Sequence, residues 1–221
     1  MARDLSTLPR RFLAWLEYLF VDHGLFRELY NNFYALPGGM FRASQPSPRQ
    51  IRKYQRKHGL RSIINLRGED DSLRYAMEAD ACSTQGIALV DFKGIKSREM
   101  PTRETLHETK RIFDSVEYPA LMHCKSGADR AGLASVLYRH FRLGESIEQA
   151  QHELDWKYGH NKAAKTGMLD FMLETYIARN RREPIDFMTW VDTEYDRKEL
   201  ESHFHSRGWA DFITDKVLKR E

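Results

Sequence analysis

Short apolar segments alternate with helix-like segments through the middle of the chain, and this alternation restricts the fold more than any other feature. Buried-strand patterns occur at residues 40–43, 62–66, 87–90 and 120–123. Segments long enough for a helix lie between and after them. Strands that alternate with helices form right-handed crossovers and a parallel sheet. We therefore predict an α/β fold with a central, mainly parallel sheet of about four to five strands, flanked by helices on both sides.

Length and turn signals indicate one central domain with an extension at each end. A chain of 221 residues suits one domain with appendages. Pro37-Gly38-Gly39 and Glu183-Pro184 interrupt the flanking helical patterns. We predict an N-terminal amphipathic helical extension over residues 1–36, a central domain over residues 37–182 and a C-terminal helical extension over residues 183–221.

The N-terminal extension contains an apolar run that follows Arg10 and Arg11. Glu17 interrupts this run, no small-residue cleavage site follows it, and it is too short to span a membrane. We therefore expect a cytoplasmic protein that keeps this helix. Two roles stay open for the helix, packing against the domain or peripheral contact with a membrane surface, since aromatic and leucine side chains beside arginine suit the lipid interface.

Charge and cysteine content exclude several classes of protein. Lys and Arg number 35 against 32 for Asp and Glu, and a formal charge of +3 is too small to indicate a nucleic-acid partner. The two cysteines cannot form a disulfide framework, and no Cys/His spacing of the metal-binding type occurs. We expect no metal, no cofactor and no nucleic acid.

The segment HCKSGADRAG, residues 123–132, carries the chemistry. It places Cys124 at the end of a predicted strand and Arg130 six positions later, at the start of a predicted helix. A short loop over a helix N-terminus directs several backbone N–H groups inward and forms an anion-binding nest, for which Gly127 permits the tight course. The helix dipole and Arg130 favour a thiolate at Cys124, and Arg130 can bind two phosphate oxygens at once.

This segment matches the Cys-x5-Arg signature, and the chain resembles the cysteine-dependent protein tyrosine phosphatase superfamily over about residues 40–180. With His123 before the cysteine and Gly127 within the loop, it is similar to the dual-specificity phosphatases. Residues 41–46 (FRASQP) and 63–67 (IINLR) look like the opening strands of bacterial members. The resemblance implies a dual-specificity phosphatase-like fold, a bacterial origin and a phosphatase domain in the central part of the chain.

The resemblance also implies a function, the hydrolysis of a phosphate monoester through a cysteinyl-phosphate intermediate by a tyrosine-type or dual-specificity enzyme. Cys124 would be the nucleophile. The phosphate would be bound by the loop, residues Lys125, Ser126, Gly127, Ala128, Asp129 and Arg130. The substrate stays open among phosphorylated proteins, phospholipid head groups and inositol phosphates. The alternative function is a phosphate-binding pseudo-phosphatase, an interaction module with little turnover.

Three carboxyl groups are candidates for the general acid that protonates the leaving oxygen. Asp129 directly precedes Arg130 and resembles an aspartate that some lipid and tyrosine phosphatases carry at this place. Asp91 ends a predicted strand and Glu99 lies in the loop that follows, where many relatives carry their acid. We favour Asp129 and keep Asp91 and Glu99 as alternatives.

Two further residues bear on the mechanism. Ala131 stands where the family usually has Ser or Thr, whose hydroxyl eases departure of the thiolate in the second step. We therefore expect slow hydrolysis of the thiophosphate, or that Ser126 or water takes over this role. Cys82 falls in a predicted helix, where a small buried core residue is expected, although in some relatives a second cysteine forms a reversible disulfide with the nucleophile.

Overall fold

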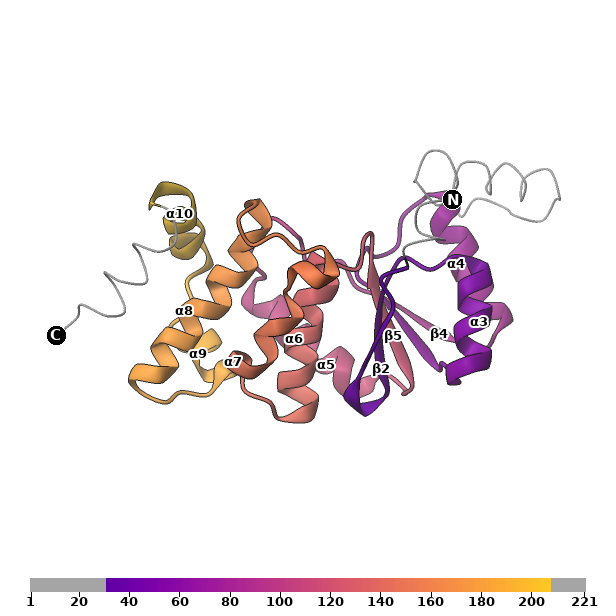
Figure 1. Ribbon diagram of the computed structural model, residues 1–221, viewed down its shortest axis with the longest axis horizontal. Coiled ribbons are helices and arrows are strands. Elements are labelled where there is room, and N and C mark those ends of the chain that lie inside the picture. The colour runs from indigo at the N-terminus through magenta and orange to yellow at the C-terminus, as the bar shows by residue number, and fades with distance from the viewer. Residues whose placement is uncertain (1–30, 208–221) are drawn as a thin grey trace. The chain divides into compact units, whose positions relative to one another are not determined.

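The computed structural model describes residues 31–207 (Figure 1). This part of the chain divides into two compact units. The first contains the chain up to Lys93 and the segment Val116–Ala131, and the second contains Gly94–Ser115 and the chain from Gly132 onward. Every strand of the described chain lies in the first unit, so the segment predicted to carry the chemistry belongs to the unit with the sheet.

The sheet has the order β1-β2-β5-β3-β4. β1 is antiparallel to β2, and the remaining pairs are parallel. The strands are Tyr34–Leu36 (β1), Met40–Ser44 (β2), Ser62–Asn65 (β3), Ala88–Asp91 (β4) and Ala120–Cys124 (β5). The predicted α/β class with a mainly parallel sheet is therefore confirmed. The central strand β5 ends at Cys124, level with Ser44 of β2, so the nucleophile candidate lies at the carboxyl edge.

Helices α3 (Pro48–His58) and α4 (Leu73–Thr84) pack against each other beside the sheet (Figure 1). Each begins with a side-chain cap. Ser47 forms a capping box with Gln50, and the Ser72 side chain accepts a hydrogen bond from the Tyr75 amide. Their inner sides share one buried apolar cluster with the strands: Ala43, Ile51, Tyr54, Leu60, Ile63, Ala81, Cys82, Ile87 and Leu121.

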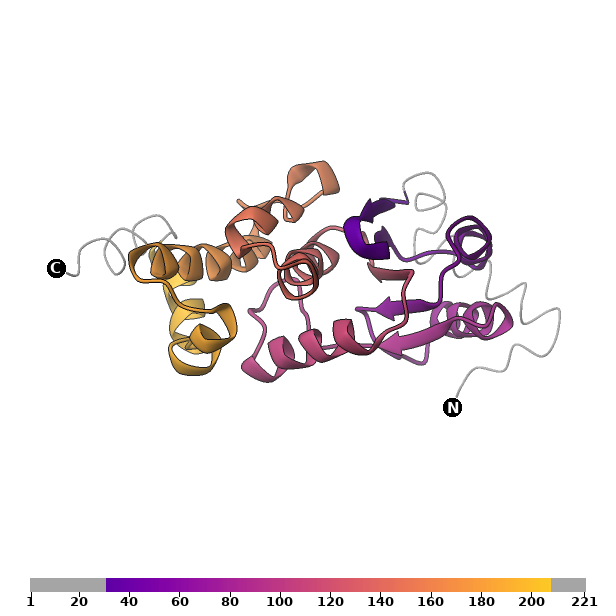
Figure 2. The same ribbon diagram turned by 90° about the horizontal axis from the view of Figure 1, so that it is seen from below.

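The second unit is built from helices and short turns (Figures 1 and 2). They are α5 (Arg103–Ser115), α6 (Asp129–Leu143), which begins in the first unit, α7 (Ile147–Ala150), α8 (Met168–Arg182), α9 (Phe187–Thr193) and α10 (Arg197–Arg207). Its buried aromatic side chains include Phe187, Trp190 and Tyr195. The Tyr195 hydroxyl donates to the carbonyl of Pro101 at 2.7 Å, which ties the segment after α9 to the start of α5.

The N-terminal extension that we predicted to be helical up to residue 36 lies outside the described residues as far as residue 30. Its last part is not helical, and this part of the prediction is wrong: residues 31–33 are irregular and Tyr34–Leu36 form β1. The glycines of the Pro37–Gly39 turn adopt positive φ, which reverses the chain and lets β1 pair with β2. The boundaries at residues 36/37 and 182/183 stay predictions.

Within residues 31–207, no helix combines the length and the apolarity that a transmembrane span requires.

Candidate active site

The loop between β5 and α6 brings the predicted nucleophile to the N-terminus of a helix. Cys124 is the last residue of β5, and α6 begins five residues later at Asp129. The backbone N–H of Gly127 donates to Cys124 Sγ at 3.3 Å. Cys124 is 2% exposed, so its sulfur lies inside the loop rather than on the surface. An amide that points at the sulfur also points at an anion bound there.

Gly127 is required by the close approach of this loop to β2. Its φ is +76°, and a Cβ atom built on it would lie 2.7 Å from the carbonyl carbon of Ala43 and the nitrogen of Ser44. Both contacts are to backbone, which cannot move aside as a side chain does. The loop is therefore packed directly onto the end of the neighbouring strand, and this packing sets its course.

Arg42 holds the loop from behind. Its side chain is fully buried in β2, and Nη2 donates to the carbonyls of Gly127 at 2.8 Å and Ala128 at 3.2 Å. These bonds keep two loop carbonyls turned toward Arg42, so the amides of the loop stay available for an anion. Arg42 is not among the site residues predicted from the sequence. The available signal was a charged residue inside a predicted buried strand.

Arg130 occupies the second position of α6, where the Cys-x5-Arg spacing predicts it. Its guanidinium donates to the carbonyl of Leu66, just after β3, at 3.1 Å. An arginine has five N–H donors, so this anchor leaves others to bind phosphate oxygens bidentately. The anchor fixes the guanidinium beside the same edge of the sheet that carries Cys124.

A buried chain of polar groups starts at His123, the residue before the nucleophile. His123 Nε2 lies 2.5 Å from Glu78 Oε1, and both side chains are almost completely buried. The other carboxylate oxygen of Glu78 accepts a hydrogen bond from Gln45 at 2.7 Å, and Gln45 in turn accepts one from Arg67. This chain links four segments that are distant in sequence. The sequence alone gives no sign of this chain of polar groups, because a glutamate in a helical segment is ordinarily exposed.

Asp91 lies at the carboxyl edge but two strand positions away from β5. Strands are about 4.8 Å apart, so β4 lies about 10 Å from β5 across the sheet. Both carboxylate oxygens of Asp91 accept hydrogen bonds, from Asn65 at 2.8 Å and from the Tyr75 hydroxyl at 2.6 Å. Burial and the bond to Asp91 together raise the pKa of Tyr75, so its hydroxyl keeps its proton and remains a donor.

Glu99 belongs to the second unit and is bound there as a carboxylate. It pairs with Lys96 at 2.8 Å and with Arg197 of α10 at 2.9 Å. Hydrogen bonds from Lys96 and Arg197 hold the pKa of Glu99 below its ordinary value. Among the three acid candidates, Asp129 is the one that the structure places on the Cys124 loop itself, half-buried at the first position of α6.

The remaining loop residues divide into exposed and buried ones. Lys125 and Ser126 are exposed at the rim, and the Ser126 carbonyl accepts a hydrogen bond from Asn32 at 2.9 Å. Ala128 and Ala131 are buried. Cys82 is buried in the core cluster beside α3, and both cysteines are free. Burial raises the pKa of the Cys82 thiol to about 12, which fits a packing role better than reaction with a second thiol.

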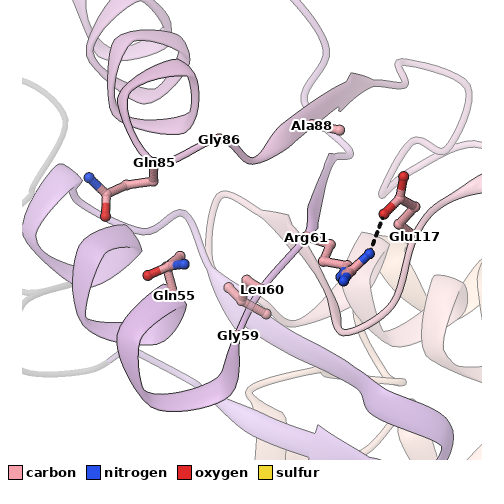
Figure 3. A pocket seen from close by; sticks show the side chains of 8 residues that line it. All are labelled: Gln55, Gly59, Leu60, Arg61, Gln85, Gly86, Ala88 and Glu117. Atoms are coloured by element: carbon pink, nitrogen blue, oxygen red, sulfur yellow. Dashed lines mark hydrogen bonds and ion pairs between the residues drawn. The ribbon is translucent and has the colours of Figure 1, made fainter.

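A surface hollow of about 440 Å³ lies elsewhere in the first unit (Figure 3). Its lining comes from the turns that precede β3 and β4, from the end of α3, from the first residue of β4 and from the segment before β5: Gln55, Gly59, Leu60, Arg61, Gln85, Gly86, Ala88 and Glu117. The exposed ion pair of Arg61 and Glu117 crosses its rim. The hollow thus lies at the amino edge of the sheet, opposite the Cys124 loop.

In residues 31–207, no group of three His, Cys, Asp or Glu side chains is arranged to hold a metal ion.

Comparison with known proteins gives one family match and several structures of similar fold. A family model described as "DSP-PTPase phosphatase fused to NAD+ Kinase" matches residues 38–170, more than half of the chain. No curated protein sequence matches the chain.

Three solved structures are similar in fold. TpbA of P. aeruginosa is 16% identical, covering 78% of this chain and 90% of its own, with a TM-score of 0.50. The PP-IP phosphatase SIW14 of S. cerevisiae is 18% identical, with 72% and 98% covered and a TM-score of 0.50. PTPMT1, solved in complex with PI(5)P, is 14% identical, with 66% and 97% covered and a TM-score of 0.50.

Identities this low establish the fold alone, whereas the family match spans β2 to β5, the Cys124 loop and α6. The chain therefore belongs to the dual-specificity phosphatase family that this match describes, and it is a cysteine-dependent phosphatase of the protein tyrosine phosphatase superfamily.

Proposed function

We propose that the protein hydrolyses phosphate monoesters through a cysteinyl-phosphate intermediate, with Cys124 as nucleophile and Arg130 as phosphate ligand. The observation that carries this proposal is the Gly127 amide aimed at Cys124 Sγ from a loop that sits on the N-terminus of α6. In the first step the S–P bond forms and the bond from phosphorus to the leaving oxygen breaks. In the second, water attacks phosphorus and the S–P bond breaks, releasing phosphate and the thiolate.

Asp129 is our choice for the general acid that protonates the leaving oxygen. It lies on the same loop as Cys124 and beside Arg130. Neither of the other two carboxylates lies on this loop, because Asp91 ends β4, two strand positions away from β5, and Glu99 follows β4 in the chain.

For the substrate we propose a phosphorylated inositol or phosphoinositide head group rather than a phosphotyrosine side chain. Two relatives in fold support this class, a phosphatase of PP-IP and a protein solved with PI(5)P. Lys125 is exposed on the loop next to Cys124 and could bind a second phosphate group. The alternative substrate class is phosphorylated proteins, and a direct comparison of substrates distinguishes the two classes.

The mechanism is tested by phosphate release from a small aryl phosphate between about pH 4 and pH 8, with EDTA present. Cys124→Ser should abolish turnover. Asp129→Asn should remove the fall in rate on the basic side, because that limb reports loss of the acid's proton, while Asp91→Asn and Glu99→Gln should keep it. A wild-type protein that binds phosphate or vanadate without turnover would favour the alternative of a phosphate-binding module.

The substrate class is tested with the same enzyme on PI(5)P, an inositol polyphosphate and a phosphotyrosine peptide. We expect the highest kcat/KM on one of the inositol compounds. Lys125→Gln should lower kcat/KM for that compound about tenfold through loss of one ion pair, and should lower kcat/KM for the aryl phosphate much less. The highest kcat/KM on the peptide would contradict the proposed class.

A further inference from the structure

Helix α3 presents a row of positive charge to the solvent. Its sequence, PRQIRKYQRKH, contains five Lys and Arg residues among 11 and no acidic residue. All five are exposed, whereas Ile51 and Tyr54 on the other side are buried in the core. The cations recur at intervals of three and four residues, which places them on one face of a helix. We call this set the α3 stripe: Arg49, Arg52, Lys53, Arg56 and Lys57.

No ion pair within the described part of the chain joins a residue of the α3 stripe to a carboxylate, whereas Arg61, Arg74 and Arg179 have acidic partners. The adjacent helix α4 adds little opposing charge. It contains two acidic residues, of which Glu78 is buried against His123 and Asp80 is exposed. The stripe is therefore not neutralised by its neighbours.

Local helix stability accounts for only part of this composition, since Arg56 and Lys57 in the last turn match the helix dipole. Like charges three and four positions apart repel one another, and cations in the first turns oppose the helix dipole, which favours acidic residues there. Arg49 and Arg52 occupy such positions. The helix begins with a capping box and is held by its apolar side, so its stability does not explain the cations at Arg49 and Arg52.

We propose that the α3 stripe is a docking surface for an anionic lipid bilayer. Clusters of four to eight Lys and Arg on an amphipathic helix bind acidic head groups. The apolar side of α3 is already packed in the protein, so the helix contributes charge without insertion. Single-stranded nucleic acid fits less well, because the stripe offers no aromatic side chain for base stacking, Tyr54 being buried.

The position of α3 makes this surface useful to a phosphatase. Ser47, its N-cap, follows β2 by three residues, and β2 ends at Ser44, level with Cys124. The stripe therefore begins next to the edge of the sheet that carries the Cys124 loop. A bilayer bound along the stripe would bring head groups close to that edge. The docking itself does not depend on the chemistry proposed for the loop.

The test is co-sedimentation of the full chain with vesicles of phosphatidylcholine alone or mixed with phosphatidylglycerol. The test variant is Arg52→Gln/Lys53→Gln/Arg56→Gln/Lys57→Gln. The control variant, Lys110→Gln/Arg111→Gln/Lys165→Gln/Lys198→Gln, removes the same charge from other exposed positions. Each cation near an acidic surface contributes about fivefold to partitioning, so the test variant should lose more than about a hundredfold.

We expect the wild type to bind the acidic vesicles and not pure phosphatidylcholine, and to lose binding as salt is raised. The control variant should bind almost as the wild type does, and all three proteins should release phosphate from an aryl phosphate equally. Absence of wild-type binding, or equal binding by both variants, overturns the proposal. So does tighter, stripe-dependent binding to a duplex RNA, which would assign the surface to nucleic acid.

Discussion

The guanidinium of Arg42 donates to the carbonyl of Gly127 at 2.8 Å, from a side chain that has no exposure to solvent. A buried arginine is costly unless its donors find acceptors, and here Nη2 donates to two carbonyls at the back of the phosphate-binding loop. The bond crosses from β2 to the loop after β5, so a residue far from Cys124 in sequence determines which way the loop amides point.

Replacing Arg42 with Met should disturb both the loop and the stability of the protein. Two buried carbonyls would lose their donor, at a cost of about 1–3 kcal/mol each, and a misplaced loop should lower kcat/KM about a hundredfold. Urea unfolding and aryl phosphate kinetics measure the two effects. Arg61→Met is the matched control, because the Arg61–Glu117 pair is largely exposed and should matter little.

Gly127 and Gly59 form a natural comparison for the effect of an added Cβ atom. Both have positive φ, +76° and +66°, but a Cβ on Gly59 meets no atom within 4 Å. Each change to Ala should cost about 1–2 kcal/mol in backbone strain. Gly127→Ala should in addition reduce activity about a hundredfold, because the loop must move away from Ala43 and Ser44. Equal activity in the two variants would show that the packing onto β2 is unimportant.

Ala131→Ser should speed the second chemical step. Ala131 is fully buried in the first turn of α6, where the family usually has a hydroxyl. If that missing hydroxyl limits thiophosphate hydrolysis, the wild type shows a burst of leaving group followed by a slow steady state. The variant should then have a higher steady-state rate and a smaller burst in rapid-quench experiments. A linear time course in the wild type would contradict this explanation.

Glu78→Gln should reduce the reactivity of Cys124. The substitution keeps the shape of the side chain but removes the carboxylate that faces His123 at 2.5 Å. Without this carboxylate the imidazole next to Cys124 loses the partner that orients it, so Cys124 and its loop should be positioned less precisely. We expect slower alkylation by iodoacetamide at neutral pH, measured by mass spectrometry at Cys124. Glu117→Gln, which alters an exposed pair, should leave that rate unchanged.

Asp70 should make stability depend on pH in the acidic range. Burial raises its pKa, but hydrogen bonds from Ser72 and the charge of Arg74 outweigh this and lower the pKa below 3.8. The stabilisation is therefore complete above about pH 4 and disappears as pH falls through the lowered folded-state value. Asp70→Asn should lose about 1 kcal/mol near pH 7. Melting curves of variant and wild type should converge in strong acid, while exposed Asp80→Asn should stay close to the wild type throughout.

Much of the fold follows from local patterns. The cap at Ser47, the cap at Ser72 and the apolar runs that became β3 and β5 are short-range signals, and the structure has each of them. β1 was missed because its three residues are too few to show a strand period. It forms because the turn at Pro37–Gly39 brings it against β2.

The sequence alone determined the relation between Cys124 and Arg130, because only four residues lie between the strand end at Cys124 and the helix start at Asp129, and so short a loop has one compact course. Only the tertiary structure decided what surrounds that loop. Arg42, Gln45 and Glu78 come from β2, the segment after it and α4, and they reach the loop and His123 because β5 lies between β2 and β3. Strand order is set by packing over the whole sheet, so no local spacing encodes these contacts.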